Sequence, residues 1–90
     1  MKTPPIPPNC ELFGIINGHL KFYVSGQWDH ISTANGERRK MIALAAIGAW
    51  HLEHNKLLES VGGPPYSDGT IRREREILIA INQWREWMEQ

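Results

Sequence analysis

Apolar residues occupy every second position on both sides of an Asn-Gly pair, at 13 and 15 before it and at 20, 22 and 24 after it. Asn17-Gly18 is the preferred pair for a two-residue type I′ turn, because both of its positions need a positive φ. This turn fixes the register of two antiparallel strands, with the predicted pairs Ile16–His19, Ile15–Leu20, Phe13–Phe22 and Leu12–Tyr23. One face of the hairpin is then wholly apolar: Phe13, Ile15, Leu20, Phe22 and Val24. Ser25-Gly26 predicts a second tight turn, into a third strand over residues 27–31.

The next segment is predicted to be a helix over about residues 36–60. Residues 32–35 offer several N-cap side chains, and the Gly-Gly-Pro-Pro run at 62–65 ends the helix. Its Met41–Trp50 block is apolar on every side. Such a helix is enclosed on more than one face, so we expect the sheet, a second helix and a second subunit to cover it. The block therefore predicts a homodimer.

A second helix is predicted over about residues 70–88, with Ser67, Asp68 or Thr70 as its cap. One stripe of its helical wheel is apolar, formed by Ile71, Ile77, Leu78, Ile81, Trp84 and Met88. A short connection makes the two helices antiparallel. The predicted fold is therefore α+β: an antiparallel hairpin or three-stranded meander packed on a C-terminal antiparallel helix pair. Residues 11–90 form this single domain, and residues 1–10 form a Pro-rich arm that favours polyproline II.

The amino-acid composition indicates the general class of protein, its location and its partners. The chain is 41% hydrophobic and 22% charged, which is ordinary globular usage. Its one cysteine, Cys10, has no internal disulfide partner, which fits a reducing, cytoplasmic location. The longest apolar block is about half the length that crosses a bilayer, so we expect no membrane association. The formal net charge of zero makes nucleic acid a less favoured partner than protein.

The charged residues of both helices are placed against the helix dipoles. Basic residues open the helices: Arg38, Arg39, Lys40, Arg72, Arg73 and Arg75. Acidic residues close them: Glu53, Glu59, Glu86 and Glu89. The dipoles favour the reverse order. Two explanations remain open. Either opposite charges meet between antiparallel helices, or the basic N-termini bind phosphate, which would make the protein a nucleic-acid-binding regulator.

No catalytic, metal or cofactor motif occurs in the sequence. His51 and His54 are three residues apart, whereas the zinc-protease pattern needs two histidines four apart. A structural zinc site needs more than one cysteine in most of its forms. We therefore expect neither an enzyme nor a bound metal or cofactor.

The tryptophans are the best functional signal, because four occur in 90 residues and Trp and Tyr dominate interface hot spots. The hairpin register puts Leu12 and Tyr23 on the face opposite the apolar one, and Trp28 follows in the third strand. Trp87 lies off the main stripe of its helix. Either the Pro-rich arm covers this second face, or Leu12, Tyr23, Trp28 and Trp87 contact a partner.

We favour the second reading, and expect a small non-catalytic regulatory or inhibitory protein that binds another protein. Compact chains of this size without motifs are common among accessory proteins of phages and mobile elements.

Overall fold

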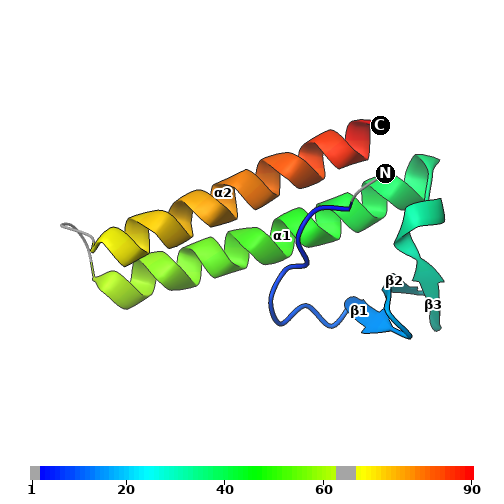
Figure 1. Ribbon diagram of the computed structural model, residues 1–90, viewed down its shortest axis with the longest axis horizontal. Coiled ribbons are helices and arrows are strands. Elements are labelled where there is room, and N and C mark those ends of the chain that lie inside the picture. The colour runs from blue at the N-terminus through cyan, green and yellow to red at the C-terminus, as the bar shows by residue number, and fades with distance from the viewer. Residues whose placement is uncertain (1–2, 63–66) are drawn as a thin grey trace.

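The computed structural model describes residues 3–62 and 67–90 and has the predicted α+β arrangement (Figure 1). A three-stranded antiparallel sheet precedes two long helices. The elements are β1 (Phe13–Ile16), β2 (His19–Val24), β3 (Gln27–His30), the 3-10 turn η1 (Ile31–Thr33), α1 (Gly36–Val61) and α2 (Asp68–Glu89). Residues 63–65 of the predicted Gly/Pro turn lie outside the described residues. No helix within the described ranges is both long and apolar enough to cross a bilayer.

The sheet confirms the register derived from the Asn-Gly turn. Asn17 and Gly18 have φ values of 53° and 78°, as a type I′ turn requires. The β1–β2 pairs include Phe13–Phe22 and Ile15–Leu20. The backbone N–H of Tyr23 donates to the carbonyl of Leu12 at 2.9 Å, which extends the same register.

The second turn, Ser25-Gly26, also has two positive φ values, 51° and 84°. It joins β2 to β3, with Tyr23 opposite Trp28 and Lys21 opposite His30. The strand order is β1-β2-β3, so the predicted meander is present and both outer strands are sheet edges.

The helices run antiparallel along the long axis of the molecule (Figure 1). Gly62 ends α1 in the left-handed conformation, with a φ of 65°. At the start of α2 the Oγ of Ser67 accepts a hydrogen bond from the backbone N–H of Thr70, at 3.2 Å. Ser67 is thus the cap among the three predicted candidates.

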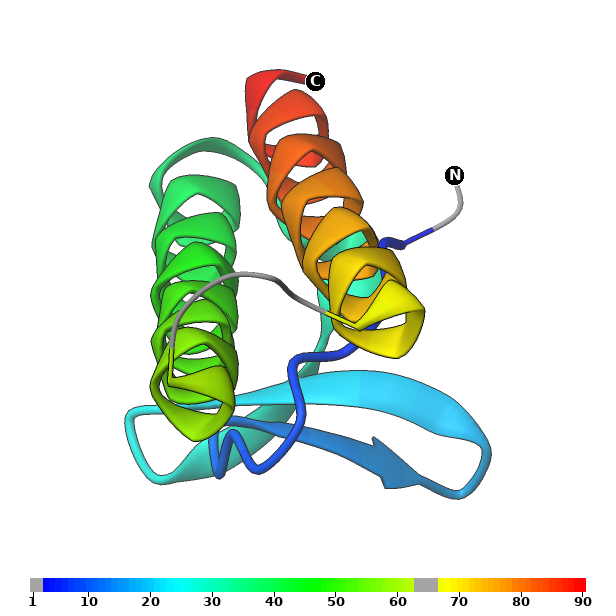
Figure 2. The ribbon, with the colours of Figure 1, turned by 90° about the vertical axis from the view of Figure 1, so that its left-hand side faces the viewer.

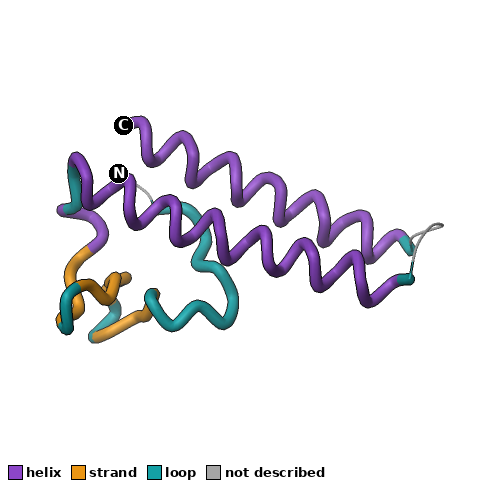
Figure 3. Tube along the Cα trace, turned by 180° about the vertical axis from the view of Figure 1, so that it is seen from behind, coloured by secondary structure: helices purple, strands orange, loops and turns teal. Residues whose placement is uncertain are grey.

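The sheet lies below the helix pair, against the N-terminal half of α1 and the C-terminal half of α2 (Figures 2 and 3). Phe13 of β1 contacts the Phe22 ring at 5.2 Å and the Trp84 ring of α2 at 5.6 Å, measured between centroids. Ile42 and Ala46 of α1 are buried in the same core. The predicted apolar face is therefore the core-facing one.

Ile15 is the exception on that face, because its side chain is 67% exposed. It sits next to the Asn-Gly turn, whereas the contact with the helices is made farther along the hairpin, at Phe13.

The buried stripe of α2 is rotated from the predicted one. Ile71 and Leu78, which belong to the predicted apolar stripe, are 45% and 44% exposed, so the buried side of the helix does not coincide with that stripe. The buried side chains of α2 are instead Thr70, Ile77, Ala80, Ile81, Trp84 and Trp87. The helix turns toward Ala80 and Trp87 because it packs on two neighbours, α1 on one side and the sheet with the arm on the other (Figure 2).

The Pro-rich arm contributes to the core instead of crossing the sheet. Pro7 is fully buried, and Ile6 packs against the core cluster. The indole Nε1–H of Trp84 donates to the carbonyl of Pro5 at 2.8 Å. The arm is thereby held beside α2, and the sheet face opposite the helices keeps exposed side chains.

Candidate functional site

The face of the sheet that points away from the helices, here called the outer sheet face, is the candidate site. It follows from the strand register and comprises Leu12, Gly14, Ile16, His19, Lys21, Tyr23, Trp28 and His30. Three of the predicted partner-binding side chains are exposed on it: Leu12 by 39%, Tyr23 by 41% and Trp28 by 37%. The alternative in which the arm covers this face is therefore not what the structure has.

Trp28 lies across the sheet from β3 toward β1. Its ring carbons Cη2 and Cζ3 are 3.4 Å from the position that a Cβ on Gly14 would take. The Tyr23 ring meets the indole edge-on, with the centroids 5.1 Å apart. Two strands thus hold the indole in place, and part of each ring remains open to solvent.

Gly14 is a site residue that the sequence analysis did not single out. A Cβ at this position would already be in van der Waals contact with the indole of Trp28, so a larger side chain would compete with the indole for this space. The strand register could have indicated this neighbour. Gly14 pairs with Lys21, and Lys21 pairs with His30, so Gly14 lies on the same face of the sheet as Trp28, which is two residues before His30.

A pair of histidines flanks the aromatic residues. The rings of His19 and His30 contact each other with centroids 4.7 Å apart. Lys21 lies between His19 and Tyr23 on β2, and no residue of the outer sheet face is acidic. No group of three metal-ligating side chains is found within residues 3–62 and 67–90.

Trp87, the fourth predicted partner-binding residue, is only 3% exposed, so predicting it on the surface was wrong. Its ring packs edge-on against Trp84 at 5.3 Å, and the guanidinium of Arg39 lies 4.3 Å from its centroid. The side of α2 that carries Trp87 faces the core, because the helix is oriented about its axis differently from the prediction.

The basic residues at the start of α1 are largely engaged within the chain. Arg38 forms an ion pair with Asp29 of β3 at 3.3 Å. Arg39 is 8% exposed, and its Nη1 donates to the carbonyl of Trp87 at 2.7 Å. It therefore caps the C-terminal end of α2 and is not open to an external anion. Lys40 is exposed.

The basic residues at the start of α2 lie at the other end of the molecule. Arg72 and Arg75 are exposed, while Arg73 bonds to Glu76 of its own helix at 3.3 Å. The antiparallel arrangement puts this cluster beside the helix connection and that of α1 beside the sheet, along a molecule 43 Å long (Figure 1). The two basic clusters do not form one surface.

The predicted attraction between opposite helix ends is replaced by other contacts. A polar contact joins the two helices: Nε2 of His54 lies 3.1 Å from Oε1 of Glu74. It connects the C-terminal half of α1 to the N-terminal half of α2. Arg38 and Arg73 use Asp29 and Glu76 instead of the glutamates of the facing helix.

The known proteins add no assignment to this geometry. No protein-family model, curated protein or solved structure matches the chain. The outer sheet face is therefore interpreted from its own residues: it has an exposed aromatic pair, an apolar margin and basic or neutral polar groups.

Proposed function

We propose that this protein is a small, non-catalytic regulatory or inhibitory protein of the cytoplasm that binds another protein through its outer sheet face. The observation that carries the proposal is the Tyr23–Trp28 pair, held edge-on at 5.1 Å while each side chain is more than one-third exposed. The lone Cys10 supports the reducing location.

Preorganisation favours binding at this face. Ordering a side chain at an interface costs about 0.5–1.5 kcal/mol. Trp28 is already fixed by Gly14 beneath it and Tyr23 beside it, so less of this cost remains to be met on association. Trp and Tyr are also the residue types that contribute most to protein interfaces when they enter a pocket of the partner.

The charges of the face indicate what kind of surface it fits. Leu12 and Ile16 extend the apolar area along β1, and Lys21 is the one permanently charged side chain of the face. Complementary potentials favour a partner surface with an apolar hollow and a neutral or acidic rim.

A matched pair of variants tests the proposal. Trp28→Ala removes the centre of the face, whereas Leu52→Ala truncates a side chain of α1 that is 61% exposed and lies outside it. The wild-type protein, immobilised and exposed to a lysate of its source, should retain a partner identifiable by mass spectrometry. Loss of a hot spot costs about 2 kcal/mol or more, so Trp28→Ala should weaken binding to the purified partner roughly thirtyfold. Leu52→Ala should leave the affinity unchanged.

Equal affinities for the two folded variants would refute the proposal. Nucleic acid is tested in parallel by a gel shift at several salt concentrations. A shift that weakens steeply with salt, and is lost on substituting Arg72 and Arg75, would favour the nucleic-acid regulator instead.

A further inference from the structure

The charged ends of α2 have no partner in the described chain. Arg72 and Arg75 are exposed near its start, and Glu86 and Glu89 are exposed near its end. None of the four makes a hydrogen bond or ion pair with any residue in 3–62 or 67–90. Each charge is also unfavourable in the dipole of its own helix. The arrangement thus has a cost that no contact within the described chain offsets.

These charges belong to a stripe with the spacing of a helix–helix seam. Exposed residues recur at alternating intervals of three and four, in the order Arg72, Arg75, Ile79, Asn82, Glu86 and Glu89. Ile79 is 49% exposed at the middle of the stripe, and Leu78 beside it is 44% exposed. A shallow hollow runs along the same surface, lined by Ile71, Glu74, Arg75, Leu78, Ile79 and Asn82. The stripe is basic at one end, apolar and neutral at its centre, and acidic at the other end.

We propose that a second copy of this chain docks on this stripe, with the two α2 helices antiparallel. The two-fold axis would cross the stripe at the level of the Ala80–Ile81 peptide bond. In an antiparallel seam the residues of each layer come from opposite ends of the two helices. Arg72 then faces Glu89 of the second copy, and Arg75 faces Glu86 of the second copy. Ile79 faces Asn82 at the centre, and symmetry repeats every contact.

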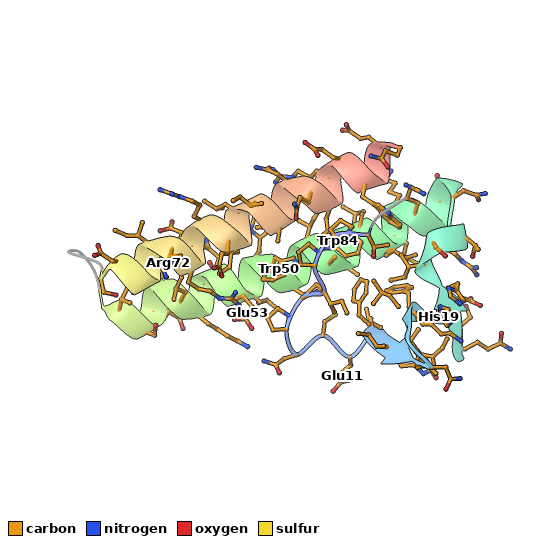
Figure 4. All side chains as sticks on the ribbon, viewed as in Figure 1. Glu11, His19, Trp50, Glu53, Arg72 and Trp84 are labelled. Atoms are coloured by element: carbon orange, nitrogen blue, oxygen red, sulfur yellow. The ribbon has the colours of Figure 1, made fainter. Side chains whose placement is uncertain are left out.

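The same geometry removes the conflict with the helix dipoles. Arg72 of each copy comes next to the C-terminal, negative end of the other α2, and Glu89 next to its positive end. Figure 4 shows Arg72 at the end of α2 nearest the helix connection, away from the sheet. All six residues of the stripe lie on α2, whereas the outer sheet face is formed by residues of the sheet, so the two proposed surfaces share no residue.

A second surface, on α1, could also hold a dimer. It belongs to the Met41–Trp50 block, from which the sequence analysis predicts a homodimer. Met41 and Leu44 are indeed 44% and 52% exposed. The exposed charges flanking this stripe are mixed at both ends, with Glu37 and Lys40 before it and Lys56 and Glu59 after it. Antiparallel self-docking would bring Glu37 near Glu59 of the second copy. Charge complementarity therefore favours α2.

Charge reversal within one layer tests the proposal. Arg75→Glu puts the new carboxylate against Glu86 of the second copy twice per dimer, and Glu86→Arg puts two arginines together twice. Each single variant removes two exposed ion pairs and creates two like-charge pairs per dimer, so it should dimerise roughly ten- to a hundredfold more weakly than the wild type. The double variant Arg75→Glu/Glu86→Arg restores both pairs with reversed signs and should dimerise as the wild type does. An equimolar mixture of the two single variants should form a heterodimer.

Sedimentation equilibrium over a range of protein concentrations measures each association, and circular dichroism verifies that each variant is folded. Lys56→Glu is the matched control, because it makes the same charge change on an exposed position of α1, outside α2 altogether. It should dimerise as the wild type does. The proposal is overturned by a wild-type monomer at high micromolar concentration, by folded single variants that dimerise normally, or by a double variant as weak as the single ones.

Discussion

Replacing Trp84 by phenylalanine should separate the contribution of the Pro-rich arm from that of core packing. Trp84 is fully buried, and its Nε1–H donates to the carbonyl of Pro5 at 2.8 Å. Phenylalanine keeps an aromatic ring against Phe13 but has no donor for this carbonyl. The variant therefore loses one hydrogen bond across 79 residues of sequence, together with part of a filled core volume.

The magnitude follows from these two losses. A typical intramolecular hydrogen bond contributes about 0.5–1.5 kcal/mol net. Truncating a buried aromatic completely costs about 3–5 kcal/mol, and losing only part of the indole should cost about 1–2 kcal/mol. Trp84→Phe should thus lower the free energy of unfolding by about 2–3 kcal/mol. For a chain of this size that corresponds to a melting temperature roughly 8–24 °C lower.

Trp50→Phe is the control, because Trp50 is 5% exposed and its Nε1–H has no hydrogen-bond partner within the described chain. Removing a buried, unsatisfied donor relieves a desolvation penalty of about 1–3 kcal/mol, which offsets the lost volume. Its melting temperature should stay within about 5 °C of the wild type. Thermal unfolding followed by circular dichroism compares the two variants. Equal melting temperatures would refute the assigned role of the Trp84–Pro5 hydrogen bond.

Three further stability predictions can be measured by urea unfolding. Gly18→Val should lower the free energy of unfolding by about 1–3 kcal/mol, because a β-branched residue resists the φ of 78° in the turn; Asn17→Gly, which accepts such φ values, should stay close to the wild type. Arg39→Met should cost about 2–3 kcal/mol, since it leaves the carbonyl of Trp87 without this charged donor; an unchanged midpoint would contradict its buried capping role. Deleting residues 1–8 should cost about 2–4 kcal/mol, because it removes a packed isoleucine, a buried proline and one hydrogen bond, and a deletion without effect would show that the arm is dispensable for the core.

The parts of the fold that depend on local rules could be predicted from the sequence. The Asn17-Gly18 pair determines a turn type, the turn determines a register, and the register sorts every strand side chain onto a face. This chain of steps predicted Leu12, Tyr23 and Trp28 on one surface, and all three are exposed there. These steps use only local rules, which give the face of each side chain but not its burial: Ile15 lies on the apolar face and is still 67% exposed.

The position of Trp87 could not be obtained in the same way. A helical wheel gives the relative angles of the side chains but not the direction from which other elements approach. The apolar residues of α2 lie on both sides of Trp84, with Leu78 on one side and Trp87 on the other. Packing of the arm and of Arg39 against α2 selects the Trp87 side and leaves Leu78 exposed. Both errors in the predicted stripe thus have one cause, a neighbour supplied by distant sequence.

The two proposed surfaces have a joint consequence for affinity, because each chain would carry one of each. A dimer formed through α2 would present two outer sheet faces, each attached to a rigid pair of helices. A partner that is itself dimeric, or that repeats its binding surface, would engage the second face at a high effective concentration, provided that its spacing matches. The charge-reversed variant Arg75→Glu retains Trp28 and Tyr23 unchanged. It should therefore bind a monomeric partner as the wild type does but lose the added affinity for a dimeric one. Equal loss for both kinds of partner would mean that α2, and not the sheet, contacts the partner directly.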